Sequence, residues 1–513
     1  MLRNKSCVPL CMPSVDPKQA QFINERIVER YGVNWMVDNL PVADVALMNA
    51  DGTVRTNSLG FPLGTILDTL GHRIDPPALY NHYLLNISYH ERAPGQFRVV
   101  GAEVLPLSLA SLAPGAAAPQ CDVKEAQALL PNATTRIAYT YSVTWTRSDT
   151  PWATRWDAFL HVVDPRIHWY SLLNSFAIVA LLCLLVGIVM AHAVRRDLYR
   201  YNAIDLTEDI QEDFGWKLVH GEVFRQPREP MLLSIMAGTG AQLTAIACVT
   251  LVFALLGFLS PSNRGSLGTI MVVMWTLFGC VSGWVSARVY ASFDGQQWRR
   301  NMMLTAVLFP SIVFGFVNVL NFVLVLNRSA GAVPFGTLLA LVALWFLINV
   351  PLSLIGSYFG MRAGGFQHPV RVNQIPRQIP PVVWYLRLWP SALLAGLLPF
   401  GAAWLELFFI INSLFGSRVY YAFGFLTLTF VVTAATTAMV SILTCYCHLC
   451  AEDYRWQWRS FITGGASAFW LFLYGMYYCL MRLSLPDLSS QVLFVGYLLM
   501  LSALDFLLFG VWD

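Results

Sequence analysis

The sequence predicts an α-helical polytopic membrane protein with about nine transmembrane helices, preceded by an N-terminal lumenal β-rich domain. Of the 513 residues, 56% are hydrophobic and only 12% are charged, whereas soluble globular chains carry about 25% charged residues. Apolar runs of about 20 residues, the length of a membrane-spanning helix, recur from residue 169 onward. The net charge of +3 is spread along the chain and predicts no nucleic-acid partner, so the lipid bilayer is the first expected partner.

Residues 1–168 have the pattern of a domain that lies in water and consists mainly of strands. A helix is expected from Asp16 to about Arg30. Three later segments are rich in aromatic and β-branched residues with partial alternation, which is typical of half-buried strands. They are 83–89, 97–104 and 136–145. Glycine and proline separate them, so a β-sheet or β-sandwich is predicted.

Two features of this domain would suit a lumenal position. Cys7, Cys11 and Cys121 lie in it, and disulfides are typical of such compartments, although an odd number leaves one cysteine unpaired within the domain. Asn86 in Asn-Ile-Ser and Asn132 in Asn-Ala-Thr are possible glycosylation sites if this side is lumenal.

Residues 169–513 contain the predicted nine-helix transmembrane domain. Such runs form helices because lipid offers no partner to a free backbone N–H or C=O group. The predicted spans are 169–191, 233–257, 267–289, 302–326, 334–360, 391–413, 420–445, 460–481 and 490–512. A polar connection at 192–232 separates the first span from the second.

The basic residues predict the orientation. Loops after the first, third, fifth and seventh spans carry 14 arginines and lysines, against 4 in or beside the opposite loops. Basic loops stay in the cytoplasm. The connection at 192–232 and the C-terminus are therefore expected in the cytoplasm, and the N-terminal domain in the lumen or outside the cell.

Polar side chains within the spans are candidates for function, because charges in lipid are costly. Glu406 lies in the middle of the sixth span; it either lines a polar cavity or client-binding groove, or packs between helices through a hydrogen bond. Asp505 lies in the last span. Asn349 and Asn412 are explained by interhelical hydrogen bonds of roughly 1 kcal/mol each.

A cluster of cysteines ends the seventh span: Cys445, Cys447 and Cys450, with His448 among them. Three thiols and an imidazole could bind zinc or copper. Their spacing is tighter than that of standard zinc sites, and juxtamembrane palmitoylation or plain packing are the alternatives. We expect neither a bound metal nor a cofactor.

The sequence assigns no catalytic residues. None of the nine histidines lies in the middle of a predicted span, so the buried base of a metalloprotease or acyltransferase, or the buried serine–histidine pair of a rhomboid-type protease, is not expected. An aspartyl protease needs two carboxylates that share one site, and Asp505 is the only deeply placed aspartate.

Four motifs stand in the loops and helices of the second half. Their residues are Trp216, His220, Gly221, Phe224 and Arg225 in 214–225; Pro376 and Arg377 in 373–380; Pro399 in 398–401; and Arg455, Trp456 and Arg459 in 453–460. In this order, and together with Gly60-Phe-Pro-Leu-Gly64 in the N-terminal domain, they resemble the nonaspanins, the transmembrane nine superfamily of endomembrane proteins, along most of the chain.

The resemblance implies a non-enzymatic protein of Golgi and endosome membranes that assists the sorting and localisation of other membrane proteins, its clients. In such a role, polar groups such as Glu406 would pair with polar residues of client helices. The alternatives are a transporter or channel for an ion or small solute, although no internal repeat is evident, and an adhesion receptor. Nonaspanins normally start with a signal peptide and end in a basic tail, and this sequence shows neither. Its N-terminal domain is therefore expected to be incomplete relative to the family. Sorting by a basic tail, a property of the family, is not inferred for this chain.

Overall fold

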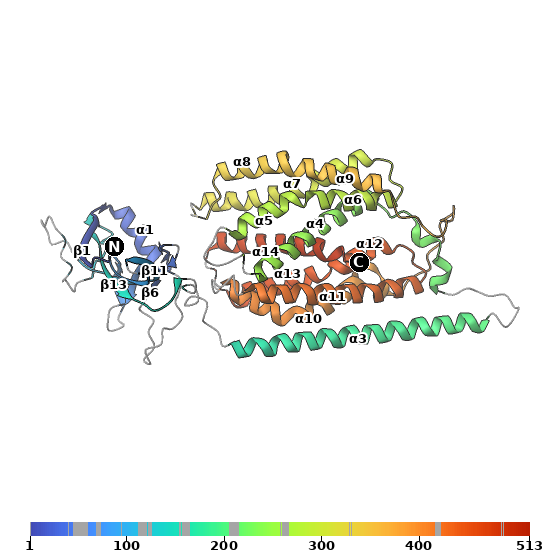
Figure 1. Ribbon diagram of the computed structural model, residues 1–513, viewed down its shortest axis with the longest axis horizontal. Coiled ribbons are helices and arrows are strands. Elements are labelled where there is room, and N and C mark those ends of the chain that lie inside the picture. The colour runs from blue at the N-terminus through green and yellow to red at the C-terminus, as the bar shows by residue number, and fades with distance from the viewer. Residues whose placement is uncertain are drawn as a thin grey trace. The chain divides into compact units, whose positions relative to one another are not determined.

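The computed structural model describes residues 2–512 except for positions 39, 45–59, 68–72, 94, 111–118, 120, 122–125, 153–154, 156–164, 205–214, 257, 259–265, 328, 330, 416–421, 484 and 486. The chain divides into two compact units, Met1–Asp164 and Pro165–Asp513 (Figure 1). Strands dominate the first unit and helices the second, which confirms the predicted fold class. The side of the membrane on which the first unit lies stays a prediction.

The first unit contains a five-stranded mixed sheet in the order β1-β13-β10-β11-β6. Its strands are β1 (Lys5–Cys11), β6 (Ala43–Asp44), β10 (His82–Ala93), β11 (Gln96–Leu107) and β13 (Tyr139–Arg147). β10 pairs with β11 in antiparallel orientation and with β13 in parallel. The predicted strand segments form the centre of this sheet because alternating apolar residues, such as Val100, Ala102 and Val104, fall on one buried face.

Four two-stranded pairs and one helix accompany this sheet in the described part of the first unit. The pairs are β2 (Ser14–Val15) with β12 (Thr135–Arg136), β3 (Gly32–Val33) with β7 (Phe61–Pro62), β4 (Met36–Val37) with β5 (Leu40–Pro41), and β8 (Gly64–Leu67) with β9 (Arg73–Leu79). The predicted helix is α1 (Pro17–Val28). Its start is fixed by Gln19, whose side-chain oxygen accepts a hydrogen bond from the Asp16 N–H at 3.2 Å.

Apolar packing and one disulfide hold the first unit together. Ile27 of α1 packs against Leu79 and other buried aliphatic residues. Cys7 and Cys121 form the disulfide, with their Cα atoms 5.9 Å apart. Cys11 is an exposed free thiol, so it is the member of the odd set that has no disulfide partner in the described part of the chain.

The second unit is helical, and eight of its described helical segments are long and apolar enough to cross a membrane. The elements are α3 (Pro165–Ile204), η2 (Gly215–Val219), η3 (Glu222–Phe224), α4 (Pro230–Leu255), α5 (Ser266–Leu277), α6 (Gly279–Ser292), α7 (Trp298–Leu326), α8 (Phe335–Leu344), the π-helix η4 (Trp345–Asn349), α9 (Val350–Ala363), η5 (Trp384–Leu386), α10 (Leu388–Phe415), α11 (Ala422–Cys450), α12 (Trp456–Gly465), α13 (Ser467–Met481) and α14 (Leu488–Gly510). The α5–α6 pair forms one span, as do α8, η4 and α9.

The predicted span 460–481 is not among these eight spans, and it is not one continuous helix. It consists of α12 and α13, which are separated at Ala466. A Cβ atom at Gly465 would come within 2.4 Å of the Phe506 ring on α14. This close approach favours glycine, and glycine weakens a helix by roughly 1 kcal/mol relative to alanine. The break therefore accompanies tight packing that hydropathy does not reveal.

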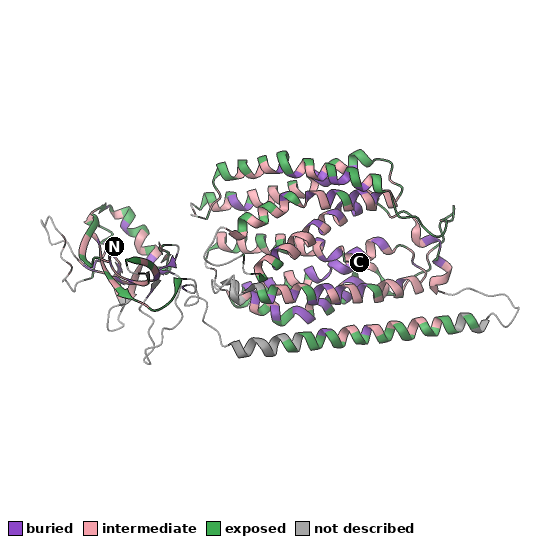
Figure 2. Cartoon of the chain, viewed as in Figure 1, coloured by how far each residue is buried: buried purple, intermediate pink, exposed green. Residues whose placement is uncertain are grey.

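The first span is longer than predicted, and it has the smallest buried fraction of the eight described spans. α3 continues to Ile204, so the predicted connection 192–232 begins inside the helix; alanine, arginine and leucine in this stretch are strong helix formers. Only 6% of the most apolar stretch of α3 is buried, against 39% for α10 and 44% for α11. Figure 2 shows α3 mostly in the colour of exposed residues.

The contact between α6 and α9 is closed by small residues. A Cβ atom at Gly283 would lie 2.0 Å from the Ser353 carbonyl oxygen, and one at Gly356 would lie 2.0 Å from a carbonyl oxygen of α6. Both belong to a glycine-xxx-glycine pair, with Gly279 and Gly360 as the second members. Only glycine lets two helix backbones come this close, so α6 and α9 pack in direct backbone contact.

Candidate functional site

Three segments that are far apart in sequence meet at one end of the helical unit (Figure 1). We call them together the loop platform, which comprises residues 215–229, 364–387 and 451–459. Trp456 Nε1 donates to the Val223 carbonyl at 2.9 Å, and Arg225 Nη2 donates to the Asn373 carbonyl at 2.7 Å. The platform therefore brings together most of the motif residues identified in the sequence.

An internal ion pair folds the first platform segment. Glu222 is 1% exposed, and its Oε2 accepts a hydrogen bond from Arg225 Nε at 2.7 Å. This bond raises the pKa of the Arg225 guanidinium. The Phe224 ring lies 4.8 Å from the His368 ring, and a Cβ atom at Gly221 would lie 3.4 Å from a carbonyl oxygen of the second segment. These contacts join the first two segments.

The other motif residues of the platform lie nearer its surface. Trp216 is half-buried in η2, and His220 is exposed. Pro376 is exposed in the second segment. Next to it, Arg377 Nη2 lies 3.0 Å from Glu452 Oε2, an ion pair between the second and third segments. This pair is partly exposed, so it contributes at most about 1 kcal/mol.

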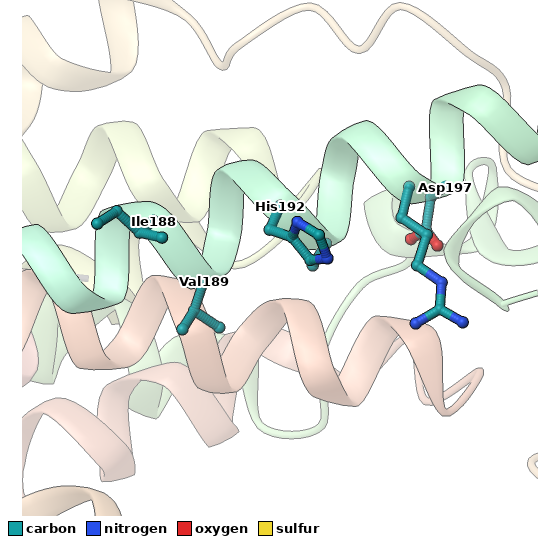
Figure 3. A pocket seen from close by; sticks show the side chains of 6 residues that line it. Ile188, Val189, His192 and Asp197 are labelled. Carbon is teal, nitrogen blue, oxygen red and sulfur yellow. The ribbon is translucent and has the colours of Figure 1, made fainter.

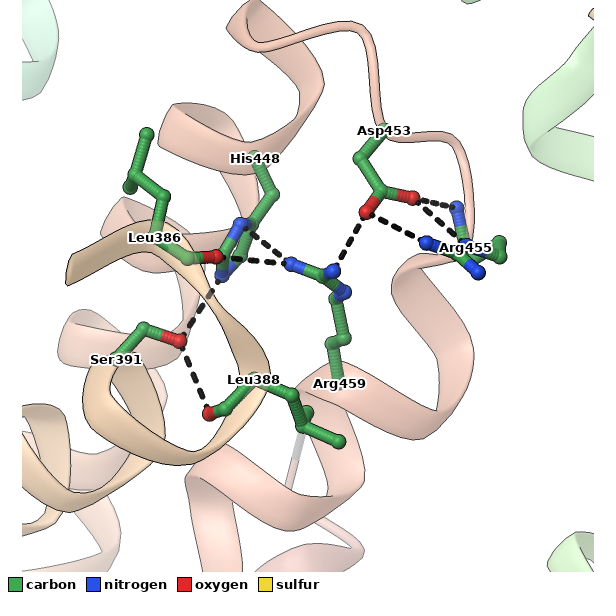
Figure 4. A network of polar contacts seen from close by, with 7 residues as sticks. All are labelled: Leu386, Leu388, Ser391, His448, Asp453, Arg455 and Arg459. Carbon is green, nitrogen blue, oxygen red and sulfur yellow. Dashed lines mark hydrogen bonds and ion pairs between the residues drawn. The ribbon is translucent and has the colours of Figure 1, made fainter. Parts of the chain in front are cut away.

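Arg459 and Arg455 enclose a buried carboxylate (Figure 4). Asp453 is fully buried. Its Oδ2 lies 2.6 Å from Arg459 Nη2, and its Oδ1 lies 3.1 Å from Arg455 Nε. Burial alone would raise the pKa of Asp453, but hydrogen bonds from Arg455 and the charge of Arg459 together lower it below its ordinary value. The carboxylate is thus ionised and ties α12 to the loop before it.

Arg459 also determines the hydrogen-bonding state of His448 on α11. Arg459 Nη1 lies 2.9 Å from His448 Nδ1, and because an arginine can only donate, Nδ1 accepts and Nε2 carries the hydrogen. Nε2 lies 3.4 Å from Ser391 Oγ on α10. The Ser391 hydroxyl in turn donates to the Leu388 carbonyl at 3.1 Å. One arginine therefore connects α10, α11 and α12.

This contact corrects the expectation that the chain has no buried serine–histidine pair. His448 stands at the end of α11 rather than in its middle, and Ser391 comes from the distant start of α10, so hydropathy could not reveal the pair. Its geometry does not suit nucleophilic catalysis, however. The histidine nitrogen that faces Ser391 carries a hydrogen and cannot take the serine proton, and Arg459 occupies the place that a carboxylate takes in a catalytic triad.

The cysteines at the end of α11 do not converge on one point. Cys447 is exposed, while Cys445 and Cys450 are half-buried. Both ring nitrogens of His448 are engaged by Arg459 and Ser391. In the described part of the chain, no three His, Cys, Asp or Glu side chains are grouped so that they could hold a metal ion. Lipid modification of Cys447 stays a prediction.

Glu406 is a fully buried acid of the membrane interior. It is 0% exposed, and neither carboxylate oxygen has a hydrogen-bond partner among the described residues. It follows Ala402 by one helical turn, and Ala402 packs with Val179 of α3 and Val432 of α11. The carboxylate therefore lies on the side of α10 that faces α3 and α11. Pro399, the last motif residue, lies one turn before Ala402 and away from the loop platform.

The other intramembrane polar residues have different surroundings. Asn349 is buried, and its Nδ2 donates to the Trp275 carbonyl at 2.8 Å. Gln242 Nε2 on α4 donates to the same carbonyl at 2.9 Å, which is one of the terminal carbonyls of α5 that lack a partner within the helix. Asp505 is half-buried in α14. The side chain of Asn412 lies outside the described part of the chain.

A buried polar ladder between α4, α6 and α7 was not predicted. Ser234 Oγ donates to Asn301 Oδ1 at 3.0 Å, and Asn301 Nδ2 donates to Ser286 Oγ at 3.1 Å. The Ser286 hydroxyl also lies 2.8 Å from Thr305 Oγ1. The spacing of Asn301 and Thr305, one turn apart on one face, is a signal that could have identified it.

The side chains of the two possible glycosylation sites differ in their exposure to solvent. Asn86 is half-buried in the central strand β10, where its Nδ2 lies 3.3 Å from Glu103 Oε2 and its Oδ1 accepts a hydrogen bond from Thr146 at 3.1 Å. Asn132 is exposed in a turn. Access therefore favours Asn132, and modification of either residue stays a prediction.

One end of α3 borders a cavity of about 570 Å³. Its lining comprises Ile188, Val189, His192, Ala193, Arg196 and Asp197. Figure 3 shows Val189 and His192 on the side of α3 that faces the neighbouring helix. The Tyr446 hydroxyl of α11 donates to Asp197 Oδ2. A polar contact thus ties this end of α3 to α11.

Known proteins resemble this chain over nearly its whole length. It matches the profile of the family described as Endomembrane protein 70 over residues 1–488. It is 41% identical over 514 residues to Transmembrane 9 superfamily member 2 of Homo sapiens, which covers 96% of this chain and 77% of that protein. Transmembrane 9 superfamily member 10 of Arabidopsis thaliana is 40% identical (99% and 82% covered), and a Transmembrane 9 superfamily protein of Schizosaccharomyces pombe is 42% identical (99% and 80%). No solved structure matches the chain.

Proposed function

Because the chain belongs to the Endomembrane protein 70 family, among the transmembrane 9 superfamily proteins, we propose that it is a non-enzymatic protein of Golgi and endosome membranes that assists the sorting of other membrane proteins. In this proposal the N-terminal unit is lumenal, and the loop platform and the C-terminus face the cytoplasm, because basic residues concentrate in the platform loops. Sorting would then use a helix face within the membrane.

The unpaired carboxylate of Glu406 is the observation that carries the proposal. A buried polar group without a hydrogen-bond partner costs about 1–3 kcal/mol, and intramembrane acids usually face a protein interior or a partner. A client helix with a hydroxyl, amide or basic side chain at this depth would supply the missing hydrogen bond. It would gain stability that the surrounding lipid cannot provide.

The weak embedding of α3 supports a place for such a client helix. Val179 contacts Ala402 near Glu406, whereas Leu181 is 63% exposed. Apolar contacts between α3 and its neighbours can be exchanged for contacts with lipid at little cost, because lipid tails are as apolar as leucine. A client helix with small residues could then lie between α3 and the α10–α11 pair, with Glu406 as its polar contact.

Site-specific photo-crosslinking in cells tests this function. A diazirine amino acid is placed either at Val179, which faces α10, or at Leu181, which is exposed, as the matched control on the same helix. We expect capture of client membrane proteins at position 179 and mainly of lipid at position 181. Glu406→Gln should reduce the capture at 179 and displace the clients from their usual membrane. Capture of lipid alone at 179, or capture that E406Q leaves unchanged, would contradict the proposal.

The alternative of a transporter or channel is favoured by the helix breaks at α5–α6 and at η4. In transporters, broken helices turn free carbonyls toward the substrate. Here the Trp275 carbonyl accepts hydrogen bonds from both Gln242 and Asn349, so protein amides already occupy it, which supports sorting over transport. Reconstitution into liposomes separates the two functions, since a solute or ion flux that Glu406→Gln abolishes would favour the transporter.

A further inference from the structure

A second cavity, of about 530 Å³, opens within the loop platform. Its lining consists of Arg225, Gln226, Pro227, Arg228, Ile379, Leu388, Tyr454, Arg455, Gln457, Trp458 and Arg459. Ligand pockets usually measure about 300–1,000 Å³. Three helices also begin at this cavity, α4, α10 and α12, and a helix start carries a partial positive charge.

The lining of this cavity has excess positive charge. Four arginines contribute to it, and no carboxylate is among its described lining residues. Behind the lining, Glu222 neutralises Arg225, and Asp453 is shared by Arg455 and Arg459. Four arginines and two carboxylates leave a net charge of +2 at this cavity, and Arg228 is the arginine without an acidic partner among these residues. A phosphate monoester, which carries a charge of about −1.5 to −2 at neutral pH, matches this excess.

Arg228 is the guanidinium most available to a ligand. Its side chain is exposed and makes no hydrogen bond or ion pair with another described residue. Its backbone, however, is held in place because Trp458 Nε1 donates to the Arg228 carbonyl. The side chain of Arg455 is likewise 50% exposed. The cavity thus offers two accessible guanidinium groups on a backbone that is already ordered.

Exposed aromatic residues place this cavity at the boundary between membrane and water. Trp384 in η5 and Trp389 at the start of α10 are 66% and 67% exposed, and such tryptophans concentrate at the headgroup level of a bilayer. The Leu386 carbonyl between them accepts a hydrogen bond from Arg459, a cavity residue, at 3.2 Å. Ile379 and Leu388 add apolar lining beside the arginines.

We propose that this cavity binds the headgroup of an anionic phospholipid that carries a phosphate monoester, as a phosphoinositide does. The guanidinium groups of Arg228 and Arg455 bind the phosphate, and the apolar lining contacts the glycerol end of the lipid. Basic pockets at the cytoplasmic ends of membrane helices are suited to such headgroups. The apolar lining and the position at the boundary favour a lipid over a free phosphate compound.

Binding of a labelled short-chain lipid to the full chain in phosphatidylcholine nanodiscs tests this site. The probe is dioctanoyl phosphatidylinositol bisphosphate, with dioctanoyl phosphatidylcholine and inositol trisphosphate as the comparison ligands. Arg228→Gln should weaken binding of the probe about tenfold, the factor that corresponds to ~1.4 kcal/mol. Arg362→Gln is the matched control, because Arg362 is an exposed arginine in the last turn of α9 that does not line the cavity. It should leave the affinity unchanged.

Each other outcome overturns the assignment. Equal losses in R228Q and R362Q would show a diffuse attraction to basic loops instead of a site. Equal affinities for the lipid probe and for inositol trisphosphate would show a site for a soluble anion. Unchanged affinity in R228Q, with the protein still monodisperse on size-exclusion chromatography, would exclude Arg228 and with it the proposed binding geometry.

Discussion

Two fully buried carboxylates, Asp453 in the loop platform and Glu406 in the membrane interior, have opposite surroundings. Asp453 contacts two arginines, whereas Glu406 has no hydrogen-bond partner among the described residues. A buried charge with its counter-charges is costly to disrupt, while a buried acid without partners costs stability. The platform therefore locks helices together. Glu406, beside the weakly embedded α3, lacks such a counter-charge, which is why we propose a partner from outside the chain for it.

The largest expected effect comes from replacing glycine by leucine at the close contact between α6 and α9, compared with the same replacement on the exposed α3. Gly283→Leu should prevent folding, at a cost above about 4 kcal/mol, because even a Cβ atom there would lie 2.0 Å from the Ser353 carbonyl oxygen. Gly187→Leu on α3 should be tolerated, because a Cβ atom there meets no atom within 4 Å. The yield of monodisperse protein on size-exclusion chromatography measures both. Equal yields would show that α9 is as loosely held as α3.

The next effect concerns the locked carboxylate. Asp453→Ala should destabilise the protein by about 3–5 kcal/mol, because it leaves Arg459, whose side chain is only 13% exposed, without its counter-charge. Glu452→Ala, which removes the neighbouring and partly exposed pair with Arg377, should cost less than about 1 kcal/mol. Thermal unfolding of the purified proteins in detergent provides the measurement. Equal melting temperatures of the two variants would show that the ion pairs of Asp453 do not stabilise the loop platform.

Removal of the Glu406 carboxylate should not lower the stability of the protein, in contrast to removal of the Asp453 carboxylate. Glu406→Leu is expected to leave stability unchanged or to raise it by about 1 kcal/mol, because it removes a buried polar group that has no described partner. The same variant should lose client capture at position 179. Thermal unfolding together with the crosslinking assay measures both effects. A large loss of stability would mean that Glu406 is a structural residue.

The smallest effect is the pH dependence of the locked carboxylate. The pKa of Asp453 is lower in the folded protein than its unfolded value of about 3.9. Its stabilising contribution is therefore complete above about pH 3.9 and is lost as the pH falls through the folded pKa. The difference in melting temperature between the wild type and Asp453→Asn should narrow below about pH 4. A difference that stays constant to pH 3 would contradict the ion pair.

The candidate site was predicted in part, and the gaps have physical causes. The motif residues were found one by one, but their meeting was not, because Trp456 and Val223 are 233 positions apart and no local pattern links them. The serine–histidine pair was missed because Ser391 and His448 come from the ends of two helices, where hydropathy carries little information. The glycine pairs of α6 and α9 have a spacing typical of close helix contacts, but they were not predicted as a contact, because only the tertiary structure shows that they face each other.

The amino-acid pattern alone was enough to predict the helical membrane unit, its strand-rich companion and the approximate spans. These follow from local rules, since lipid forces each crossing segment to satisfy its own backbone with about 20 apolar residues. Whether a buried charge is paired, and whether a helix face is closed, depends on tertiary packing. Both are decided by distances of a few ångströms between residues that the chain brings together from far apart, as at Asp453, Glu406 and Gly283.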